Sequence, residues 1–354
     1  MDAVPQALVE AVRTAAAART PLCLRGSGSK DFYGNAPRGE PLDTRAWSGI
    51  VRYEPTELVV TARCGTPLAA LEATLAERGQ MLPFEPPHHG PGATVGGCVA
   101  AGLSGPRRAS AGAVRDFVLG ARLLDGQARV LVFGGEVMKN VAGYDVSRLL
   151  AGSLGTLGVI LEVSFKVLPQ PPEERTLRFE LPEARAIESL NQWAGRPLPI
   201  SASAWRDGVL NLRLSGAAAA LRAAGEKLGG EALAADAAQA YWRGVREQTD
   251  AFFGGAAPLW RVALPASAAP LGLVGETMIE WGGALRWLRT QAPAARVREV
   301  AARAGGHATL YRAADRTGGA FAPLAPIALR MHRGLKAVFD PVGIFNPGRL
   351  YAEF

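Results

Sequence analysis

Residues 25–30 read RGSGSK and directly follow the short apolar stretch PLCL at 21–24. Gly26 and Gly28 allow the main chain to approach a ligand without an intervening Cβ atom. Successive N–H groups in such a turn can point at a phosphate, and the serine hydroxyls add further donors. Two interpretations follow: a phosphate-binding loop, or an ordinary surface turn of the kind that Gly and Ser commonly form.

The loop matches neither of the two familiar nucleotide motifs. A Rossmann fingerprint requires a third glycine or alanine and the start of a helix, but Asp31 occupies the third position. A P-loop requires Gly before its lysine, whereas Lys30 follows Ser29. If the loop binds phosphate, it therefore belongs to a different fold.

Two further glycine clusters occur downstream. GPGATVGG (90–97) opens a run of small residues predicted as a helix, so backbone donors and a helix N-terminus coincide, which favours an anion. GSLGTLGVI (152–160) precedes a predicted strand. Three such clusters within about 135 residues predict one long diphosphate ligand that contacts all three loops.

The chain divides at a proline-rich stretch near 169–174. In the second half, short predicted strands alternate with helices, which predicts an α+β unit with an antiparallel sheet and helices on one face. The apolar residues of the C-terminal segment predict that it packs back on the first unit. We therefore expect domains at 1–172 and 173–335, with a tail at 336–354 that returns to the first.

The composition of the chain excludes several classes of function. The 354 residues carry a net charge of +7 without a dense basic run, so nucleic-acid binding is not predicted, whereas an anionic cofactor or substrate suits the charge. Cys23, Cys64 and Cys98 form no C-x-x-C pair, so no metal site or iron–sulfur cluster is predicted in this chain. Lone thiols, the absence of an apolar run of about 18 residues and an amphipathic N-terminus predict a cytoplasmic protein without a transmembrane segment.

Several stretches together resemble the flavin-binding family typified by vanillyl-alcohol oxidase, the PCMH-type flavoproteins. They are RGSGSK, GPGATVGG, VRDFVLG (114–120), the segment 134–160 and FDPVGIFNPGRLY (339–351). EPPHHGPGAT (85–94), SGPRRASAG (104–112) and GGEVMKNVAGYD (134–145) more closely resemble the E-subunit family of bacterial glycolate oxidases. The resemblance implies a PCMH-type FAD-binding domain of two α/β subdomains and a smaller α+β cap domain with an antiparallel sheet.

The resemblance also implies which residues contact FAD. In the first loop these are Arg25, Gly26, Ser27, Gly28, Ser29 and Lys30, and in the second Pro91, Gly92, Ala93, Thr94, Gly96 and Gly97. Arg115 and Asp116 are expected beside the flavin and ribityl chain. The third loop contributes Gly152, Ser153, Gly155, Thr156, Gly158 and Ile160, and the tail contributes Asn346. Lys139 is either a further cofactor contact or a solvated surface lysine.

Two departures from the family pattern refine this picture. Covalent members attach FAD through a first-loop histidine, but this loop has Ser29 and Lys30, so we expect non-covalent FAD. Catalytic 2-hydroxy-acid dehydrogenases of this type carry an H-G-x-G-x-x-H segment, which does not occur in this chain. The chain is therefore expected to relay electrons or shape the complex while a sister flavin subunit oxidises the substrate, and no catalytic residue is assigned.

The function implied is that of an FAD-binding oxidoreductase subunit of a glycolate oxidase complex. Such a complex oxidises glycolate, a small anionic 2-hydroxy acid, to glyoxylate, and passes electrons through an iron–sulfur subunit to quinone. The expected partners are the sister flavin subunit and the iron–sulfur subunit, with peripheral attachment at the inner face of the cytoplasmic membrane left open. Two alternatives remain: a stand-alone FAD oxidoreductase for another small hydroxylated substrate, with His307 or Tyr311 as base, or a structural subunit that has lost FAD.

Overall fold

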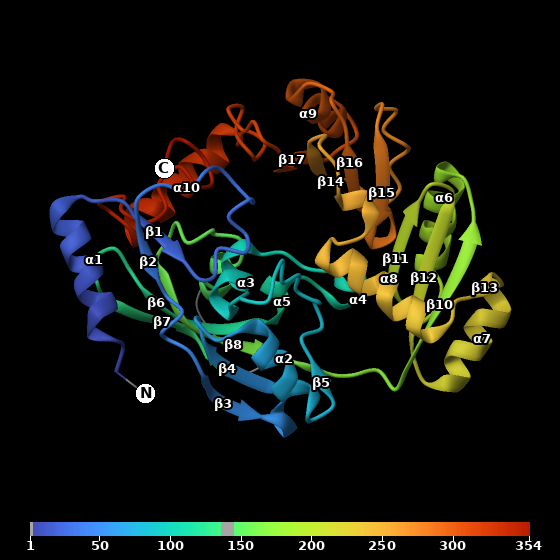
Figure 1. Ribbon diagram of the computed structural model, residues 1–354, viewed down its shortest axis with the longest axis horizontal. Helices are drawn as coiled ribbons and strands as arrows, with labels where there is room; N and C mark the ends of the chain where they lie inside the picture. The colour runs from blue at the N-terminus through green and yellow to red at the C-terminus, as the bar shows by residue number, and fades with distance from the viewer. Residues whose placement is uncertain (1–2, 136–144) are drawn as a thin grey trace.

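The computed structural model describes residues 3–135 and 145–354 and shows two halves side by side, each with helices and a β-sheet (Figure 1). The first half is built on an antiparallel sheet in the order β3-β4-β8-β6-β7. Its strands are β3 (Ile50–Glu54), β4 (Val59–Arg63), β6 (Val118–Leu124), β7 (Val130–Gly134) and β8 (Val159–Lys166). β8 lies at the centre because the run VILEVSF is buried along its whole length. Glu162 within that run is compensated by Arg122, whose guanidinium lies 2.7 Å from its carboxylate.

Short elements complete the first half and shape its loops. They are α1 (Gln6–Ala18), α2 (Leu68–Ala76), α3 (Val95–Ala101), α4 (Arg108–Ala111), α5 (Val114–Phe117), and the antiparallel pair β5 (Gln80–Met81) and β9 (Leu168–Pro169). α2 buries Leu68, Leu71 and Leu75, which are spaced to lie on one side of the helix. α3 packs on β4 and β8 through Val95, Cys98 and Val99.

The C-terminal tail returns to the first half. β1 (Leu22–Arg25) and β2 (Glu40–Asp43) form a separate parallel pair, and α10 (Pro326–Phe339) precedes the tail. The N–H of Leu22 donates to the carbonyl of Ile344 (2.7 Å), and the N–H of Asn346 donates to the carbonyl of Leu22 (2.9 Å). The buried ammonium of Lys336 pairs with Asp340 at 2.7 Å. The tail thus lies beside the strand that leads into the first glycine loop.

The second half contains an antiparallel sheet in the order β13-β10-β12-β11-β15-β16-β14-β17. Its strands are β10 (Glu173–Glu180), β11 (Ile200–Arg206), β12 (Val209–Gly216), β13 (Glu231–Ala232), β14 (Leu259–Ala263), β15 (Glu276–Glu280), β16 (Leu285–Arg289) and β17 (His307–Arg312). Its helices are α6 (Glu183–Ala194), α7 (Ala218–Leu228), α8 (Ala235–Glu247) and α9 (Ala294–Arg303). This mixture of helix and antiparallel sheet confirms the predicted α+β class.

The expectation that helices cover only one face of this sheet is wrong. α6 and α7 pack on one face around Leu210 and Trp205. α8 packs on the other face, where Trp242 contacts Ala202 and Ala204. Alternate residues of a strand point to opposite faces, and the two small alanines leave room for the indole. α8 therefore lies between the sheet and the first half (Figure 1).

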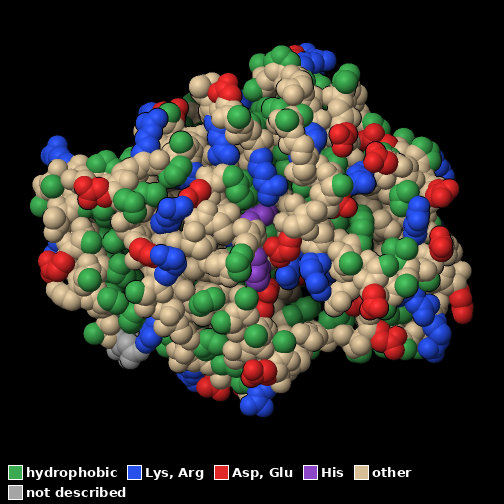
Figure 2. Space-filling view, in the orientation of Figure 1, with side chains coloured by type: hydrophobic (Ala, Val, Ile, Leu, Met, Phe, Trp, Pro, Cys, Tyr) green, Lys and Arg blue, Asp and Glu red, His purple; other side chains and the backbone are tan. Residues whose placement is uncertain are grey.

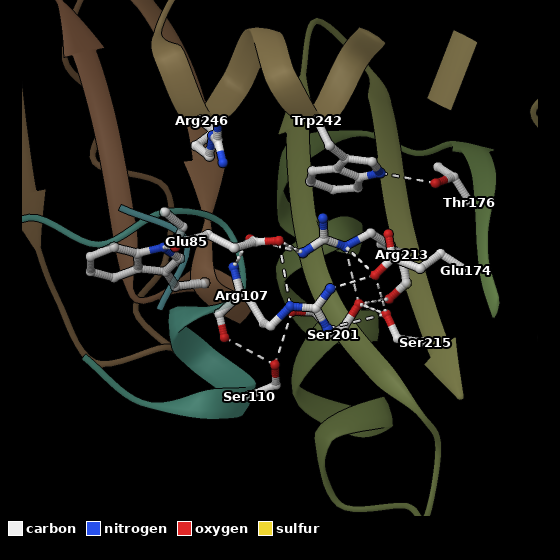
Figure 3. Close-up of polar contacts among 12 residues, drawn as sticks. Glu85, Arg107, Ser110, Glu174, Thr176, Ser201, Arg213, Ser215, Trp242 and Arg246 are labelled. Atoms are coloured by element: carbon white, nitrogen blue, oxygen red, sulfur yellow. Dashed lines mark hydrogen bonds and ion pairs between the residues drawn. The ribbon is translucent and has the colours of Figure 1, made fainter. Parts of the chain in front are cut away.

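A network of ion pairs joins the two halves (Figure 3). Glu85, from the first half, accepts bonds from Nη2 of Arg213 on β12 at 2.8 and 2.9 Å and from the backbone N–H of Arg107 at 2.8 Å. The guanidinium of Arg107 in turn pairs with Glu174 on β10. Burial would raise the pKa of Glu85, but Arg213 and Arg107 outweigh it and hold that pKa below its ordinary value. Because both buried arginines have carboxylate partners, the network holds the halves in a defined orientation.

Candidate functional site

The three glycine clusters meet at one place in the first half. Gly26 lies so close to the second loop that a Cβ atom there would be 2.5 Å from Oγ1 of Thr94. A Cβ on Gly92 would be 3.0 Å from Cβ of Ser27. In the third loop, a Cβ on Gly155 would be 2.7 Å from Nδ2 of Asn346. The loops approach one another this closely only because these positions are glycine.

The loops line a continuous groove, which we call the loop groove. It consists of two adjoining cavities that share Leu24, Arg25, Gly26, Gly97, Ala100, Leu154 and Asn346. The other lining residues are Cys23, Ser27, Gly28, Ser29, Lys30, Asp31, Pro37, Thr44, Cys64, Thr94, Gly96, Ala101, Gly155, Gly158, Val159, Ile160 and Arg349. The groove thus brings together the whole predicted first loop with parts of the second loop, the third loop and the tail.

The first loop supplies free donors to this groove. Within residues 3–135 and 145–354, the backbone N–H groups of Ser27, Gly28 and Lys30 donate to no protein acceptor. The loop is held by neighbouring bonds, from the N–H of Ser29 to Oγ of Ser27 (3.3 Å) and from the N–H of Asp31 to the carbonyl of Gly28 (3.0 Å). Unpaired backbone donors in a glycine turn suit an anionic group.

Lys30 adds positive charge beside these donors. Its ammonium donates to the backbone carbonyl of His88 at 3.1 Å. In the part of the chain that the structure describes, no carboxylate lies within ion-pair distance of it. Burial lowers the pKa of Lys30, and the negative charge of Glu247 partly offsets this shift. An anion in the loop groove would compensate this half-buried cation, whereas Arg25 is already paired with Asp31 at 2.6 Å.

The second loop packs closely against its neighbours, and the backbone N–H groups at the start of α3 already donate to protein acceptors. The N–H of Val95 donates to the carbonyl of Thr66 (3.0 Å), and that of Gly96 donates to the carbonyl of Cys64 (2.8 Å). The N–H of Gly97 donates to Oγ1 of Thr94 (3.2 Å), which caps α3. The structure therefore differs from the expected anion site at this helix N-terminus, because protein groups already accept from these donors.

Two tail residues position the groove walls. Oδ1 of Asn346 accepts from the N–H of Leu24 (2.8 Å), and its Nδ2 donates to the carbonyl of Leu154 (2.6 Å), so the amide ties β1 to the third loop. The buried guanidinium of Arg349 donates to the carbonyls of Lys30 (3.3 Å) and Asp31 (3.2 Å). Sequence reasoning missed Arg349, although it lies in the tail motif FDPVGIFNPGRLY.

Other predicted residues lie outside the groove lining. Arg115 and Asp116 are exposed on α5, and Oδ2 of Asp116 accepts from the N–H of Ala113 (2.8 Å) to cap that helix. Pro91 and Gly92 are exposed beside the first loop, and Ala93 is buried behind it. A different cavity, against α10, is lined by Gly152, Ser153 and Thr156. Lys139 lies outside the described residues.

Comparison with known proteins agrees with this geometry. A family model described as an FAD binding domain matches residues 4–134. The chain is 51% identical over 348 residues to the glycolate oxidase subunit GlcE of Escherichia coli (strain K12), covering 98% of this chain and 97% of that protein. The chain belongs to the GlcE family. The resemblance inferred from the sequence is thereby confirmed, and so is FAD as the cofactor of its N-terminal domain.

More distant relatives of this GlcE-family chain share part of its length. The glycolate oxidase subunit GlcD of Bacillus subtilis (strain 168) is 30% identical over 161 residues, which cover 45% of this chain and 34% of that protein. A solved structure of alkyldihydroxyacetonephosphate synthase superposes with a TM-score of 0.68 at 16% identity, over 97% of this chain and 75% of that one. That structure supports the PCMH-type fold.

Within the described residues of the GlcE-family chain, no helix is long and apolar enough to cross a bilayer. Over the same ranges, no group of three or more His, Cys, Asp or Glu side chains is placed to hold a metal ion.

The cleft between the halves holds a second group of polar side chains. Figure 2 shows histidines in a hollow near the middle of this face. Nε2 of His89 lies 3.3 Å from the hydroxyl of Tyr311, and burial together with Lys30 lowers the pKa of His89 to about 3, so its ring is neutral. Burial raises the pKa of Tyr311. His307, the other base considered from the sequence, is exposed at the start of β17.

A small cavity in this cleft is lined by Arg261, Glu280 and Tyr311 among others. The carboxylate of Glu280 accepts from Nε1 of Trp287 at 2.6 Å, and burial raises its pKa to about 7. This carboxyl group therefore exchanges a proton near neutral pH, next to a cation on β14. Such a pair can exchange a proton with a small polar molecule. The cavity has a volume of about 20 Å³, which holds about one water molecule. Sequence reasoning missed Arg261 and Glu280 because neither belongs to a motif.

Proposed function

We propose that this chain is the FAD-binding subunit of a glycolate oxidase complex, acting with a sister flavin subunit and an iron–sulfur subunit. The observation that carries the proposal is the convergence of three glycine loops on one groove, in a chain 51% identical to a GlcE subunit over almost its whole length. We propose that residues 1–172 and the tail 336–354 form the FAD-binding unit and that 173–335 form the cap. We place the protein in the cytoplasm, attached peripherally to the membrane only through the complex.

Each part of the loop groove has a role in holding the cofactor. Bound FAD would supply the hydride acceptor for oxidation of glycolate to glyoxylate, with electrons leaving through the iron–sulfur subunit to quinone. The N–H groups of Ser27, Gly28 and Lys30 would donate to the diphosphate, and the Lys30 ammonium would balance its charge. Gly155 permits the third loop to close on the tail, where Asn346 fixes it.

We propose that FAD is held without a covalent bond. The supporting observation is that no histidine is among the described residues that line the loop groove. Its cysteines, Cys23 and Cys64, are neutral thiols, since burial raises the pKa of both, that of Cys64 to about 12. A neutral thiol is a poor nucleophile.

The test is to purify the chain co-expressed with the sister flavin subunit and the iron–sulfur subunit of a glycolate oxidase. We expect a yellow complex with absorbance near about 370 and 450 nm, as for any oxidised flavin, and glycolate-dependent reduction of a quinone analogue. Acid precipitation is expected to release FAD into the supernatant. A colourless complex would contradict the cofactor role, and flavin that stays with the precipitate would contradict non-covalent binding.

A second candidate function is oxidation of a small 2-hydroxy acid by this chain alone. Arg261, Glu280 and Tyr311, which line one cavity between the halves, favour it, and it requires that cavity of about 20 Å³ to open around the substrate. It predicts that the isolated, FAD-loaded chain reduces an artificial acceptor with glycolate and that Arg261→Met abolishes this turnover. Turnover that appears only with the sister subunit present would exclude this candidate.

A further inference from the structure

The C-terminal helix α10 exposes a stripe of large apolar side chains. Ile327, Met331 and Val338 are 62%, 65% and 65% exposed. Their spacing places them on one side of the helix, whereas Lys336 and Phe339 face the core. Single exposed apolar side chains are common, but a contiguous set marks an interaction surface. We call these three residues the α10 stripe.

An apolar cavity adjoins the stripe. Its volume is about 340 Å³, and Met331 forms part of its wall. The opposite wall comes from the third glycine loop and the tail, with Leu149, Leu157 and Phe354. Leu149 is itself 45% exposed. A cavity of this size beside an apolar stripe can receive a bulky side chain from another molecule.

Two cations flank the stripe. Arg330 and Arg333 are exposed on α10. Across residues 3–135 and 145–354, neither guanidinium has a carboxylate within ion-pair distance. In Figure 1, α10 lies on the outer side of the first half, near the C-terminus. A complementary partner would therefore carry acidic residues around an apolar anchor.

We propose that the α10 stripe and its cavity dock an amphipathic segment of another subunit of the complex, with one bulky apolar residue in the cavity and acidic residues opposite Arg330 and Arg333. This inference rests on the proposed function, which makes the chain a subunit. A partner protein fits better than a bilayer because the concave cavity needs a protruding side chain to fill it. A second copy fits less well because two such surfaces would bring like charges together.

The test is co-purification of tagged chains with the other glycolate oxidase subunits. The variant is Met331→Glu/Val338→Glu, and the matched control is Val274→Glu, at a valine 91% exposed on the cap half. We expect the double variant to weaken partner binding by at least about 30-fold, as loss of an interface hot spot does. The control is expected to bind as wild type does. Flavin absorbance and melting temperature should match wild type in both variants, because no substituted side chain lines the loop groove.

Each outcome separates the inference from the proposed function. If wild type co-purifies and the double variant does so equally well, the docking surface is wrong while the proposed function stands. If wild type itself captures no subunit, the proposed function fails, and the inference fails with it. Binding of wild type but not the variant to anionic phospholipid vesicles, with co-purification unchanged, would assign the surface to the membrane instead. A concentration-dependent dimer lost in the variant would assign it to a second copy.

Discussion

Replacing Gly26 by alanine tests whether direct contact between the loops holds the proposed cofactor site together. The new Cβ would lie 2.5 Å from Oγ1 and 3.2 Å from Cγ2 of Thr94. Thr94 cannot turn away without loss, because its Oγ1 accepts from the N–H of Gly97 and caps α3. Overpacking of this kind costs about 1–3 kcal/mol. If the loops separate to relieve it, FAD affinity falls about 5- to 150-fold.

The assay is titration of the apoprotein with FAD, followed by quenching of flavin fluorescence. Thr94→Ala removes both clashing atoms and costs only the helix cap, about 1 kcal/mol, so Gly26→Ala/Thr94→Ala should bind FAD better than Gly26→Ala alone. Gly135→Ala is the control, because, beyond Gly135 itself and its chain neighbours, no atom of residues 3–135 and 145–354 lies within 4 Å of its added Cβ. Wild-type affinity in Gly26→Ala, or strictly additive losses in the double variant, would refute the argument that the loops are in contact.

Two further predictions concern buried carboxylates. Glu85→Ala removes the close partner of Arg213 and leaves only Glu174, whose carboxylate lies 3.8 Å from its Nε. The variant should be destabilised by up to about 3–5 kcal/mol in urea unfolding at pH 7. The pKa of Glu85 is held low, so its stabilisation is present above the unfolded pKa of about 4.3 and is lost as pH falls through the folded value. The difference from wild type should therefore shrink in acid, and a constant difference would contradict the ion-pair account. Glu280→Gln retains an acceptor for Trp287 but cannot ionise. The pKa of Glu280 is raised to about 7, so wild-type stability falls as pH rises above about 4.3. The variant should then be more stable than wild type by about 3 kcal/mol at pH 8 and equal to it near pH 4. Equal stability at both pH values would show that Glu280 is not buried as a neutral acid.

Local patterns in the sequence predicted most elements of the fold. The apolar run of β8, the helical spacing of α2 and the three glycine clusters depend on residues close in the chain, so each can be predicted without the rest of the protein. β2 and β15 are exceptions that no local pattern predicts. β2 reads EPLD and β15 reads ETMIE, and neither shows the clear apolar alternation of a strand. Recognition of the family depended on the same local stretches.

Long-range packing decided how the site works. The sequence placed Gly152 and Gly155 together in one loop, but only the fold shows that Gly155 lines the loop groove while Gly152 faces α10. The pairing of Glu85 with Arg213 joins residues 128 positions apart, and no local pattern encodes it. Asn346 likewise acts through backbone groups more than 190 residues away. Short-range spacing therefore predicted which segments meet at the loop groove. Which of their atoms remain free to bind a ligand depends on partners that folding brings from distant parts of the chain.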